Sequence, residues 1–533
     1  MIATWLALSA LTFQADTSHA VIPRPVALTR GAGAFVLTQR TAIVAAPELA
    51  ALAWQLADAL APATGWRLPV RTAAAATPAI VLRIDRSLAP LGDEGYRLDV
   101  TPRRVTIRAP HAAGVFYGIQ TLRLLLPPEI MRAAPVAGMA WMVPVVSVAD
   151  QPRFPWRGAH LDAGRHFMPK SFVKRYIDLL ALHKLNRFHW HLTEDQGWRL
   201  EIRRYPRLTQ VGGCRSGTLI GRPSNDTLQH RFTTVPHCGF YTQDDVREIV
   251  AYAAARFITV VPEIELPGHS QAAIAAYPEL GVSGRQLDVW RVWGVSDNIL
   301  APTDSTVAFY RNVLEEVLEL FPGPWVHIGG DEAVKTQWTG NPAVEARRQQ
   351  LGVRDMHELQ SWFIRQMDQF LTERGRRLIG WDEILEGGLA PNATVMSWRG
   401  MAGGIAAARA GHDVVMTPTS HTYFDYYQTR DVAREAPRIG GFLPLDTVYA
   451  FEPVPPGLTA EEARHVLGTQ GQLWSEYLPS GRDVEWQVFP RLTALAEVAW
   501  SPREARDLAD FQRRLLGFQQ RLDALDVNYY RLR

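Results

Sequence analysis

Residues 325–332 read Trp-Val-His-Ile-Gly-Gly-Asp-Glu, a short apolar run that leads through two glycines into two adjacent carboxylates. The run has the length and composition of a buried strand. Gly329 and Gly330 allow backbone dihedrals that are closed to other residues, and they let a ligand approach the chain closely. Asp331 and Glu332 can act there as an acid, a base or a charge-stabilising group. Because a Gly-Gly-Asp-Glu string also occurs in ordinary polar loops, its meaning depends on the rest of the chain.

Seven further apolar runs alternate with helical patterns along the chain. Including the quoted one, the expected strands are 158–162, 187–192, 258–264, 325–328, 378–381, 394–398, 414–417 and 466–474. Apolar residues at helical spacing predict helices at 170–183, 242–256, 306–321, 356–375 and 402–410. Eight strand-and-crossover units predict an α/β fold with a (β/α)8 TIM barrel rather than an open sheet.

Polar residues follow the C-terminal end of each expected strand. They are Arg165 and His166, Glu194 and Asp195, Glu263, Glu265 and His269, Asp331 and Glu332, Trp381 to Glu383, Trp398, Tyr423 to Asp425, and Trp474 to Glu476. Catalytic residues of such barrels lie at this end of the strands. The pattern therefore predicts one site that is assembled from all eight strand ends.

The chain has 533 residues, which is long enough for a barrel and one or two smaller domains. Residues 21–150 alternate apolar and polar side chains and then show helical spacing at 112–126, which predicts a small α+β domain. The Pro-containing stretch at 150–155 is typical of a junction. We expect the barrel at 151–505 and a C-terminal helical segment at 506–533 that packs on the barrel.

Charge and hydropathy exclude some functional classes. The 56 Lys and Arg residues nearly balance the 54 Asp and Glu residues, so no overall charge favours nucleic acid or an anionic membrane as a partner. No run of about 18 apolar residues indicates a membrane span.

The first 20 residues resemble a secretory signal. Residues 2–13 are mostly apolar, and Ser18-His19-Ala20 resembles a cleavage site, although a basic n-region is missing. We expect a periplasmic or secreted protein; the alternatives are a mis-set start codon or a simple disordered N-terminus, with a cytoplasmic location. Cys214 and Cys238 bracket one Gly-rich stretch. They form one disulfide in an oxidising compartment and two free thiols in the cytosol, and their spacing does not suit a zinc site.

The motifs at the strand ends closely resemble the family 20 glycoside hydrolases, the β-N-acetylhexosaminidases, from about residue 23 to the C-terminus. The matching stretches are Leu-Asp-Ala-Gly-Arg-His-Phe at 161–167, His-Trp-His-Leu-Thr-Glu-Asp-Gln-Gly-Trp at 189–198, Val-Pro-Glu-Ile-Glu-Leu-Pro-Gly-His at 261–269, His-Ile-Gly-Gly-Asp-Glu at 327–332, Gly-Trp-Asp-Glu at 380–383 and Leu-Trp-Ser-Glu at 473–476.

The resemblance implies an exo-acting enzyme that removes terminal β-linked N-acetylhexosamine from oligosaccharides or glycoconjugates. Glu332 is then the general acid, and the substrate's own 2-acetamido carbonyl is the nucleophile, an exception to the usual pair of carboxylates. Asp331 accepts a hydrogen bond from the acetamido N–H and stabilises the oxazolinium charge. Tyr423 contacts the acetamido carbonyl oxygen. No cofactor and no metal are implied.

Further site residues are carried over by the same resemblance. Trp381, Trp398 and Trp474 enclose the acetyl group and the sugar ring, and Arg165, Asp425 and Glu476 hold ring hydroxyls. His269 and Glu194 orient the catalytic carboxylates, with His327 close behind them. The family often has Asp where this chain has Glu194, which puts the pairing geometry in doubt. His189, His191 and His327 also suit a metal site, but packed strand-end histidines are the favoured interpretation.

Two other functions stay open at this stage. One is a retaining barrel glycosidase with two carboxylates about 5 Å apart and Asp425 or Glu476 as nucleophile. The other is a non-catalytic sugar-binding barrel. The sequence carries no code for the preferred substrate in the loops at 212–239 and 285–298, where Trp290 and Trp293 are either a leaving-group platform or packing residues.

Overall fold

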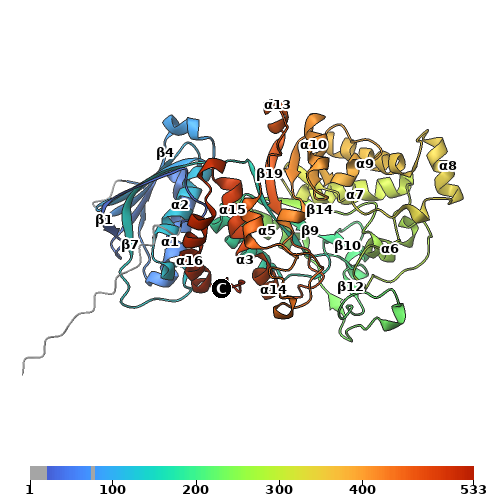
Figure 1. Ribbon diagram of the computed structural model, residues 1–533, viewed down its shortest axis with the longest axis horizontal. Coiled ribbons are helices and arrows are strands. Elements are labelled where there is room, and N and C mark those ends of the chain that lie inside the picture. The colour runs from blue at the N-terminus through green and yellow to red at the C-terminus, as the bar shows by residue number, and fades with distance from the viewer. Residues whose placement is uncertain (1–20, 74–77, 533) are drawn as a thin grey trace, which may run out of the picture. The chain divides into compact units, whose positions relative to one another are not determined.

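The computed structural model describes residues 21–73 and 78–532, and Figure 1 shows its ribbon. The predicted signal segment, residues 1–20, lies outside the described residues. The chain forms two compact units. The first contains the chain up to Gln151 together with Ala509–Asp526, and the second contains Pro152–Leu508 and the chain from Val527 onward.

The first unit is built on a seven-stranded mixed sheet with the order β1-β7-β5-β6-β4-β2-β3. Its strands are β1 (Ala27–Val36), β2 (Ala42–Ala45), β3 (Val70–Arg71), β4 (Ala79–Ile84), β5 (Tyr96–Thr101), β6 (Arg104–Ala109) and β7 (Met142–Asp150). The helices α1 (Ala50–Thr64) and α2 (Ala112–Leu125) pack on it. Alternate strand residues such as Ile80, Leu98 and Ile107 are buried, as a half-covered sheet requires.

The second unit is a closed barrel of eight parallel strands in the order β14-β15-β16-β17-β18-β19-β8-β9. The strands are β8 (Trp156–Asp162), β9 (Arg187–His191), β14 (Thr259–Glu263), β15 (Trp325–His327), β16 (Arg377–Trp381), β17 (Thr394–Ser397), β18 (Val414–Met416) and β19 (Val466–Gly471). The predicted fold, a (β/α)8 barrel that follows a smaller α+β domain, is confirmed. Every predicted strand overlaps one of these eight.

The predicted helices also form. They are α3 (Lys170–Leu182), α5 (Gln243–Ala254), α7 (Asp304–Leu320), α9 (Met356–Thr372) and α10 (Ala402–Arg409). The start of α5 illustrates the local cause, because Thr242 and Asp245 form a reciprocal capping box. The remaining α-helices of this unit are α4 (Arg207–Gln210), α6 (Gln271–Ala276), α8 (Pro342–Gln350), α11 (Thr419–Thr422), α12 (Leu445–Ala450), α13 (Ala460–Ala463), α14 (Gly481–Val488) and α15 (Arg491–Trp500).

The C-terminal segment differs from the prediction. Helix α16 (Leu508–Ala524) belongs, apart from its first residue, to the first unit, while the residues of the segment up to Leu508 and those from Val527 belong to the barrel unit. The buried Arg521 of α16 donates hydrogen bonds to the carbonyl oxygens of Leu124 and Leu126 at the end of α2. The helix is therefore part of the N-terminal unit, which periodicity alone could not reveal. Within the described residues, no helix combines the length and apolar composition that crossing a membrane would need.

The loop after β9 carries two small hairpins, β10 (Thr193–Glu194) with β11 (Gly197–Trp198) and β12 (Cys214–Arg215) with β13 (His237–Cys238). Cys214 and Cys238 lie opposite each other in the second hairpin and are joined by a disulfide. This bond closes a loop whose ends are 24 residues apart.

Replacing both cysteines by serine is expected to loosen this loop by up to about 3 kcal/mol, because the open chain gains conformational entropy. The barrel itself should remain folded. Amide hydrogen exchange should quicken between residues 215 and 237 and stay unchanged in β15. Unaltered exchange throughout the loop would show that the bond adds no local stability.

Candidate active site

The C-terminal strand ends surround a cavity of about 250 Å³. Eight of the predicted site residues line it: Arg165, Asp331, Glu332, Trp398, Tyr423, Asp425, Trp474 and Glu476. Four lining residues were not predicted: Gly294, Val295, Tyr426 and Ile439. Glu194, His269, His327 and Trp381 are buried and are absent from the lining, so they act through the residues that they contact.

The turn after β15 requires its two glycines. Gly329 and Gly330 have φ values of 66° and 93°, which side-chain-bearing residues rarely adopt. A Cβ atom on Gly329 would lie 1.6 Å from Oε2 of Glu265, a buried carboxyl group on the neighbouring strand end. Glu332 itself has a φ of 45°, a left-handed backbone that is costly for a non-glycine residue. The strained backbone conformation at Glu332 thus sets the direction of its side chain.

The variant Gly329→Ala is expected to lower stability far more than Gly352→Ala. Both glycines have nearly the same φ, 66° and 67°, but nothing lies within 4 Å of a Cβ on Gly352. The control therefore measures only the left-handed backbone, about 1–2 kcal/mol, while Gly329→Ala adds the clash with Glu265. Thermal unfolding of the two variants decides, and equal losses would contradict the clash.

His269 connects the two catalytic candidates to the barrel interior. Its Nε2 lies 3.4 Å from a Glu332 oxygen and 3.7 Å from an Asp331 oxygen. Its Nδ1 lies 2.8 Å from Oε1 of Glu194 and 3.4 Å from Asp195. Burial alone would lower the pKa of His269, but Glu194 and the other carboxylates raise it well above its usual range. The ring therefore carries a positive charge and donates to carboxylates on both sides.

The two adjacent carboxylates have opposite pKa shifts. Burial raises the pKa of Asp331 to about 7, although the charge on His269 opposes the rise. The hydrogen bond from His269 lowers the pKa of Glu332, whose side chain is 41% exposed. The pKa values of Asp331, Glu332 and His269 thus depend on one another. A ligand that covers Glu332 will therefore change which of the three groups holds a proton.

Glu194 reaches its partners despite its extra methylene group. Besides His269, its carboxylate lies 3.1 Å from Nη2 of Arg165 and 3.1 Å from Nε2 of His191. Burial opposes the charge on Glu194, but Arg165 and His269 hold its pKa well below the usual range. The departure from Asp therefore leaves the pairing with His269 intact, and the same carboxylate also contacts Arg165.

Glu263 is a second buried hub, and sequence analysis did not assign it a role. Its carboxylate lies 2.5 Å from Nδ1 of His191, 3.1 Å from His189 and 2.9 Å from His327. The indole N–H of Trp381 also donates to it, at 2.9 Å. Burial opposes its charge, but the surrounding histidines keep its pKa well below the usual range. Glu263 thereby fixes a predicted wall of the acetyl pocket and, through His191, links to Glu194.

The same histidines bear on the question of a metal. His160, His189 and Glu263 place donor atoms close enough to share an ion. Glu263 is nevertheless engaged by hydrogen bonds with His191 and Trp381, so its charge is compensated within the protein. Packed strand-end histidines account for this cluster, and the expectation that the site needs no metal stays a prediction.

Arg165 gathers the carboxylates on the opposite side of the cavity. It lies 3.4 Å from Glu476 and 3.3 Å from Asp162, and its guanidinium group lies 4.8 Å from the ring centre of Trp474. One oxygen each of Asp331, Asp425 and Glu476 is buried without a hydrogen-bond partner among the described residues. Buried acceptors need donors, so a ligand with several hydroxyl or amide groups suits this cavity.

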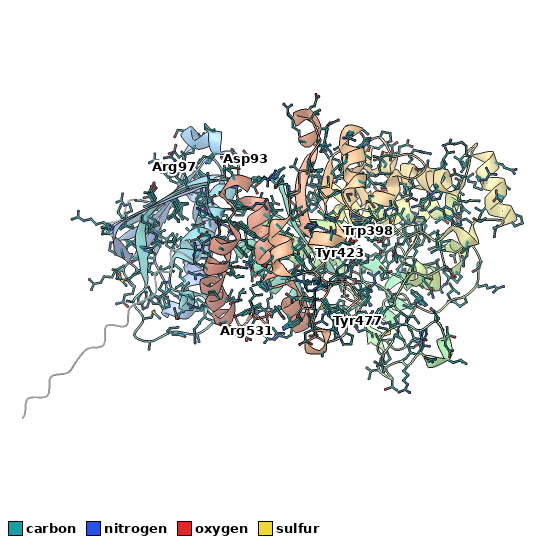
Figure 2. The ribbon with its side chains drawn as sticks, viewed as in Figure 1. Asp93, Arg97, Trp398, Tyr423, Tyr477 and Arg531 are labelled. Carbon is teal, nitrogen blue, oxygen red and sulfur yellow. A yellow bond between two sulfur atoms is a disulfide. The ribbon has the colours of Figure 1, made fainter. Side chains whose placement is uncertain are left out.

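Aromatic rings form the remaining walls, and Figure 2 labels two of them, Trp398 and Tyr423. These rings stack with centres 6.1 Å apart, and Trp381 lies 5.7 Å from Trp474. The indole N–H of Trp398 donates to Glu383 at 2.9 Å. Burial, followed by the charge of Asp331, raises the pKa of Glu383 to about 8. Glu383 was visible in the sequence as a strand-end carboxylate, but no feature there distinguished it from Asp382.

Neither of the two loop tryptophans lines the cavity, as a stacking platform for the leaving group would. Trp293 is only 3% exposed and contacts His166 and Arg215. Trp290 is partly buried and is absent from the lining, whereas Gly294 and Val295 from the same loop reach the cavity. The structure thus favours packing for Trp293.

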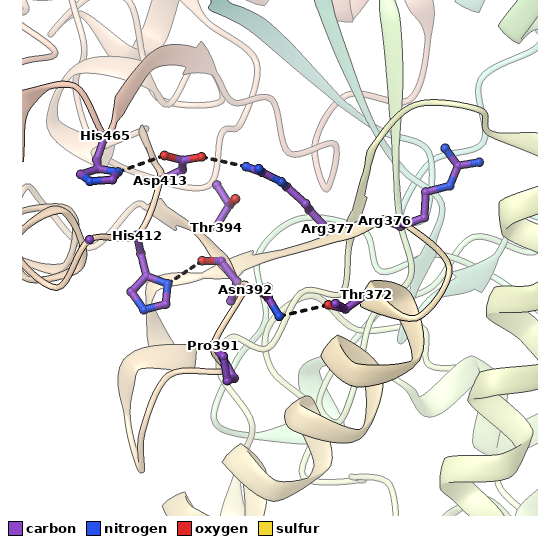
Figure 3. A pocket seen from close by; sticks show the side chains of 12 residues that line it. Thr372, Arg376, Arg377, Pro391, Asn392, Thr394, His412, Asp413 and His465 are labelled. Carbon is purple, nitrogen blue, oxygen red and sulfur yellow. Dashed lines mark hydrogen bonds and ion pairs between the residues drawn. The ribbon is translucent and has the colours of Figure 1, made fainter.

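A larger depression of about 540 Å³ lies at the opposite, N-terminal ends of β16 to β19 (Figure 3). Its charged side chains satisfy one another, since Asp413 pairs with Arg377 at 3.0 Å and with His465 at 3.1 Å. None of the predicted site residues lines it. Because barrel enzymes act at the C-terminal strand ends, we assign the active site to the smaller cavity.

Comparisons with known proteins identify the family. Residues 154–503 match the model of the glycosyl hydrolase family 20 catalytic domain, and residues 18–151 match domain 2 of that family. The chain belongs to glycosyl hydrolase family 20.

Named relatives include a beta-hexosaminidase of Porphyromonas gingivalis, 46% identical over 97% of this chain, and a beta-N-acetylhexosaminidase of Cellulomonas fimi, 35% identical over 93% of this chain and 92% of its own length. The chain spans 65% of the length of the Porphyromonas relative. The structure of the GH20 beta-N-acetylhexosaminidase from Streptomyces coelicolor A3(2) superposes with a TM-score of 0.84 at 35% identity and covers 97% of this chain and 98% of its own.

Proposed function

We propose that this family 20 chain is an exo-acting β-N-acetylhexosaminidase, which removes terminal non-reducing GlcNAc or GalNAc from oligosaccharides or glycoconjugates. The observation that carries the proposal is the placement of Asp331 and Glu332 side by side in the lining of a small cavity, with His269 in reach of both. The names of the relatives support it, as does a Streptomyces plicatus beta-hexosaminidase mutant, solved in complex with its product GlcNAc, at a TM-score of 0.84 and 34% identity.

The proposed reaction proceeds in two steps with retention. Glu332 gives its proton to the glycosidic oxygen while the acetamido carbonyl oxygen attacks the anomeric carbon and the bond to the leaving group breaks. The ionised Asp331 accepts the acetamido N–H and balances the charge of the oxazolinium ring. Glu332, now a carboxylate, then takes a proton from water. The water oxygen bonds to the anomeric carbon, and the bond between that carbon and the acetamido oxygen breaks, which opens the oxazolinium ring. Arg165, Asp425 and Glu476 hold ring hydroxyls in this proposal.

The geometry disfavours the covalent alternative. Burial raises the pKa of Asp425 well above its usual range, and a protonated carboxyl is a poor nucleophile. Glu476 lies 3.4 Å from Arg165, which suits an acceptor held in place. A non-catalytic binding barrel would have no need for the strained backbone at Glu332.

A panel of nitrophenyl glycosides tests the proposal. The purified protein should hydrolyse the β-N-acetylglucosaminide or the β-N-acetylgalactosaminide and leave the α-anomers intact. No hydrolysis of either substrate, with sugar binding retained, would favour the non-catalytic barrel instead.

Replacing His269 by asparagine is expected to move the acidic limb of the pH profile to higher pH. Asp331 must be ionised, so activity falls as the pH drops through its pKa. The charge of His269 opposes the burial that raises this pKa to about 7, and its loss therefore raises the pKa further. The profile of kcat/KM on an activated aryl glycoside, whose departure needs little acid, isolates this effect. A limb that stays in place or moves to lower pH would contradict the assignment.

We also propose that the protein works in the periplasm or outside the cell. The bonded pair Cys214 and Cys238 supports this location, because structural disulfides persist in oxidising compartments. A non-reducing peptide map of the natively produced protein should recover the two cysteines as one linked peptide pair. Alkylatable thiols in both positions would count against export.

A further inference from the structure

Among the described residues of the N-terminal unit, the α-helices pack on one face of the sheet and none packs on the other. Buried side chains such as Leu82, Leu98 and Ile107 point toward the face on which α1 and α2 pack. Because side chains alternate along a strand, Arg83, Arg97 and their neighbours at even steps point to the other face. Figure 1 shows α1, α2 and α16 together on one side of the strands, and Figure 2 labels Arg97.

Arginines lie side by side across this open face. Arg97 of β5 is paired in register with Arg108 of β6, and Arg108 lies beside Arg83 of β4. Arg108 forms ion pairs with Asp85 and Asp99, at 3.3 Å and 3.1 Å. Like charges in neighbouring register positions destabilise a sheet, and the two ion pairs of Arg108 offset this cost for one member of the row.

Three arginines of this face have no acidic partner among the described residues. Arg83, Arg97 and Arg104 are exposed, and within residues 21–73 and 78–532 none of them forms an ion pair. A groove of about 500 Å³ lies along β2 and β4, with Arg83 and Arg104 among its lining residues. Its apolar floor includes Ala79, Val44 and Val81, and Glu48 is the one carboxylate among its described lining residues.

The sequence shows the same asymmetry of charge. Residues 21–151 contain thirteen arginines, no lysine and eight acidic residues. The rest of the chain holds 43 basic and 46 acidic residues, so the near balance of the whole chain conceals a basic N-terminal unit. A local excess of this kind raises the concentration of anions at the surface that carries it.

We propose that the helix-free sheet face of the N-terminal unit, centred on Arg83, Arg97 and Arg104, docks an anionic polysaccharide. Guanidinium groups pair with carboxylate and sulfate groups through two parallel hydrogen bonds. Arg83, Arg108 and Arg97 form one register row across β4, β6 and β5, whose strands are about 4.8 Å apart, and Arg104 lies four residues before Arg108 on β6. A linear polyanion can follow this arrangement. None of the described residues that line the groove is aromatic, so it offers no ring on which the bases of single-stranded nucleic acid could stack.

Binding of labelled chondroitin sulfate to the full chain, followed by fluorescence anisotropy, tests the proposal without reference to hydrolysis. The chain should bind it saturably at low salt, lose it as salt rises, and ignore neutral dextran. The double variant Arg83→Ser with Arg104→Ser should bind about ten-fold more weakly, as expected for two lost ion pairs.

The matched control is Arg67→Ser with Arg132→Ser. Arg67 is an exposed residue near α1, and Arg132 is the exposed residue that follows the 3-10 helix Pro128–Met131. The control therefore removes the same charge as the first double variant. This control should bind within about two-fold of the parent. Hydrolysis of an aryl glycoside by both double variants reports that they are folded. Equal weakening by the control, absence of binding by the parent, or tighter binding of single-stranded DNA of matched charge would each overturn the proposal.

Discussion

A β-glucoside is expected to react at least about three orders of magnitude more slowly than the matching β-N-acetylglucosaminide, because it lacks the acetamido group that is the nucleophile in the proposed mechanism. A nucleophile held inside the substrate gains an effective molarity of about 10⁵ M or more. The cavity offers such a group one oxygen of Asp331 that is buried without a hydrogen-bond partner among the described residues, and Trp398 and Trp474 in the lining, with Trp381 packed behind Trp474. The measurement is kcat/KM for the two nitrophenyl substrates.

Two further readouts separate chemistry from binding in this comparison. Fluorination of the acetyl group leaves its shape nearly unchanged but weakens the carbonyl as a nucleophile, so kcat should fall steeply. Asp331→Asn should also lose activity, because a neutral amide cannot balance the oxazolinium charge. A stable thiazoline mimic should inhibit competitively and tightly. Equal rates for the two sugars, or a sugar trapped on Asp425 or Glu476 and seen by mass spectrometry, would establish the two-carboxylate mechanism instead.

The barrel was predictable because its signals are local. Each strand is a short apolar run that ends in polar residues, as at 325–332, and each helix has its own periodicity and cap, as at Thr242. Eight of the twelve cavity-lining residues followed from the same strand ends, and the other four did not. The site of α16 was not predictable, because an amphipathic helix shows that it packs but not against what. Its partner became visible only through contacts such as Arg521 with the end of α2.

The hubs behind the site show a second limit of sequence reasoning. Glu263 and Glu383 looked like other strand-end carboxylates, and their roles depend on which indole or imidazole reaches them across the barrel. The arginine row of the N-terminal unit was hidden for another reason. Arg83, Arg97 and Arg108 are separated in sequence and meet only through strand register, and the charge of the whole chain averages them away.

The interior of the barrel links Arg165 at the cavity to His269 beside Asp331 and Glu332, so in the proposed mechanism it couples sugar binding to acid catalysis. Glu194 touches both Arg165, which faces the cavity, and His269, which bonds the catalytic carboxylates. Through His191 it also connects to Glu263 and hence to Trp381. A change at any member therefore leaves another buried charge without its partner, which costs several kcal/mol. This explains why so many ionisable groups are tolerated in one core.

Replacing Glu332 by glutamine is expected to cut turnover of a natural disaccharide by roughly 100-fold or more, since general acid catalysis contributes about that much. The loss should shrink on an activated aryl glycoside, whose leaving group departs without a proton. The amide has the shape of the acid, so the fold should persist, and Glu373→Gln, at an exposed position near the end of α9, serves as the control for an added amide.

The resting state sharpens this prediction. His269 lowers the pKa of Glu332, whereas an acid catalyst must hold a proton when the bond breaks. Substrate provides the change, because covering a side chain that is 41% exposed removes water from the carboxylate and favours its neutral form. The pKa read from kcat should therefore exceed that read from kcat/KM on the basic limb, and Glu332→Gln should abolish that limb. Turnover of the disaccharide near that of the parent protein, or a basic limb that survives the substitution, would assign the proton to another group.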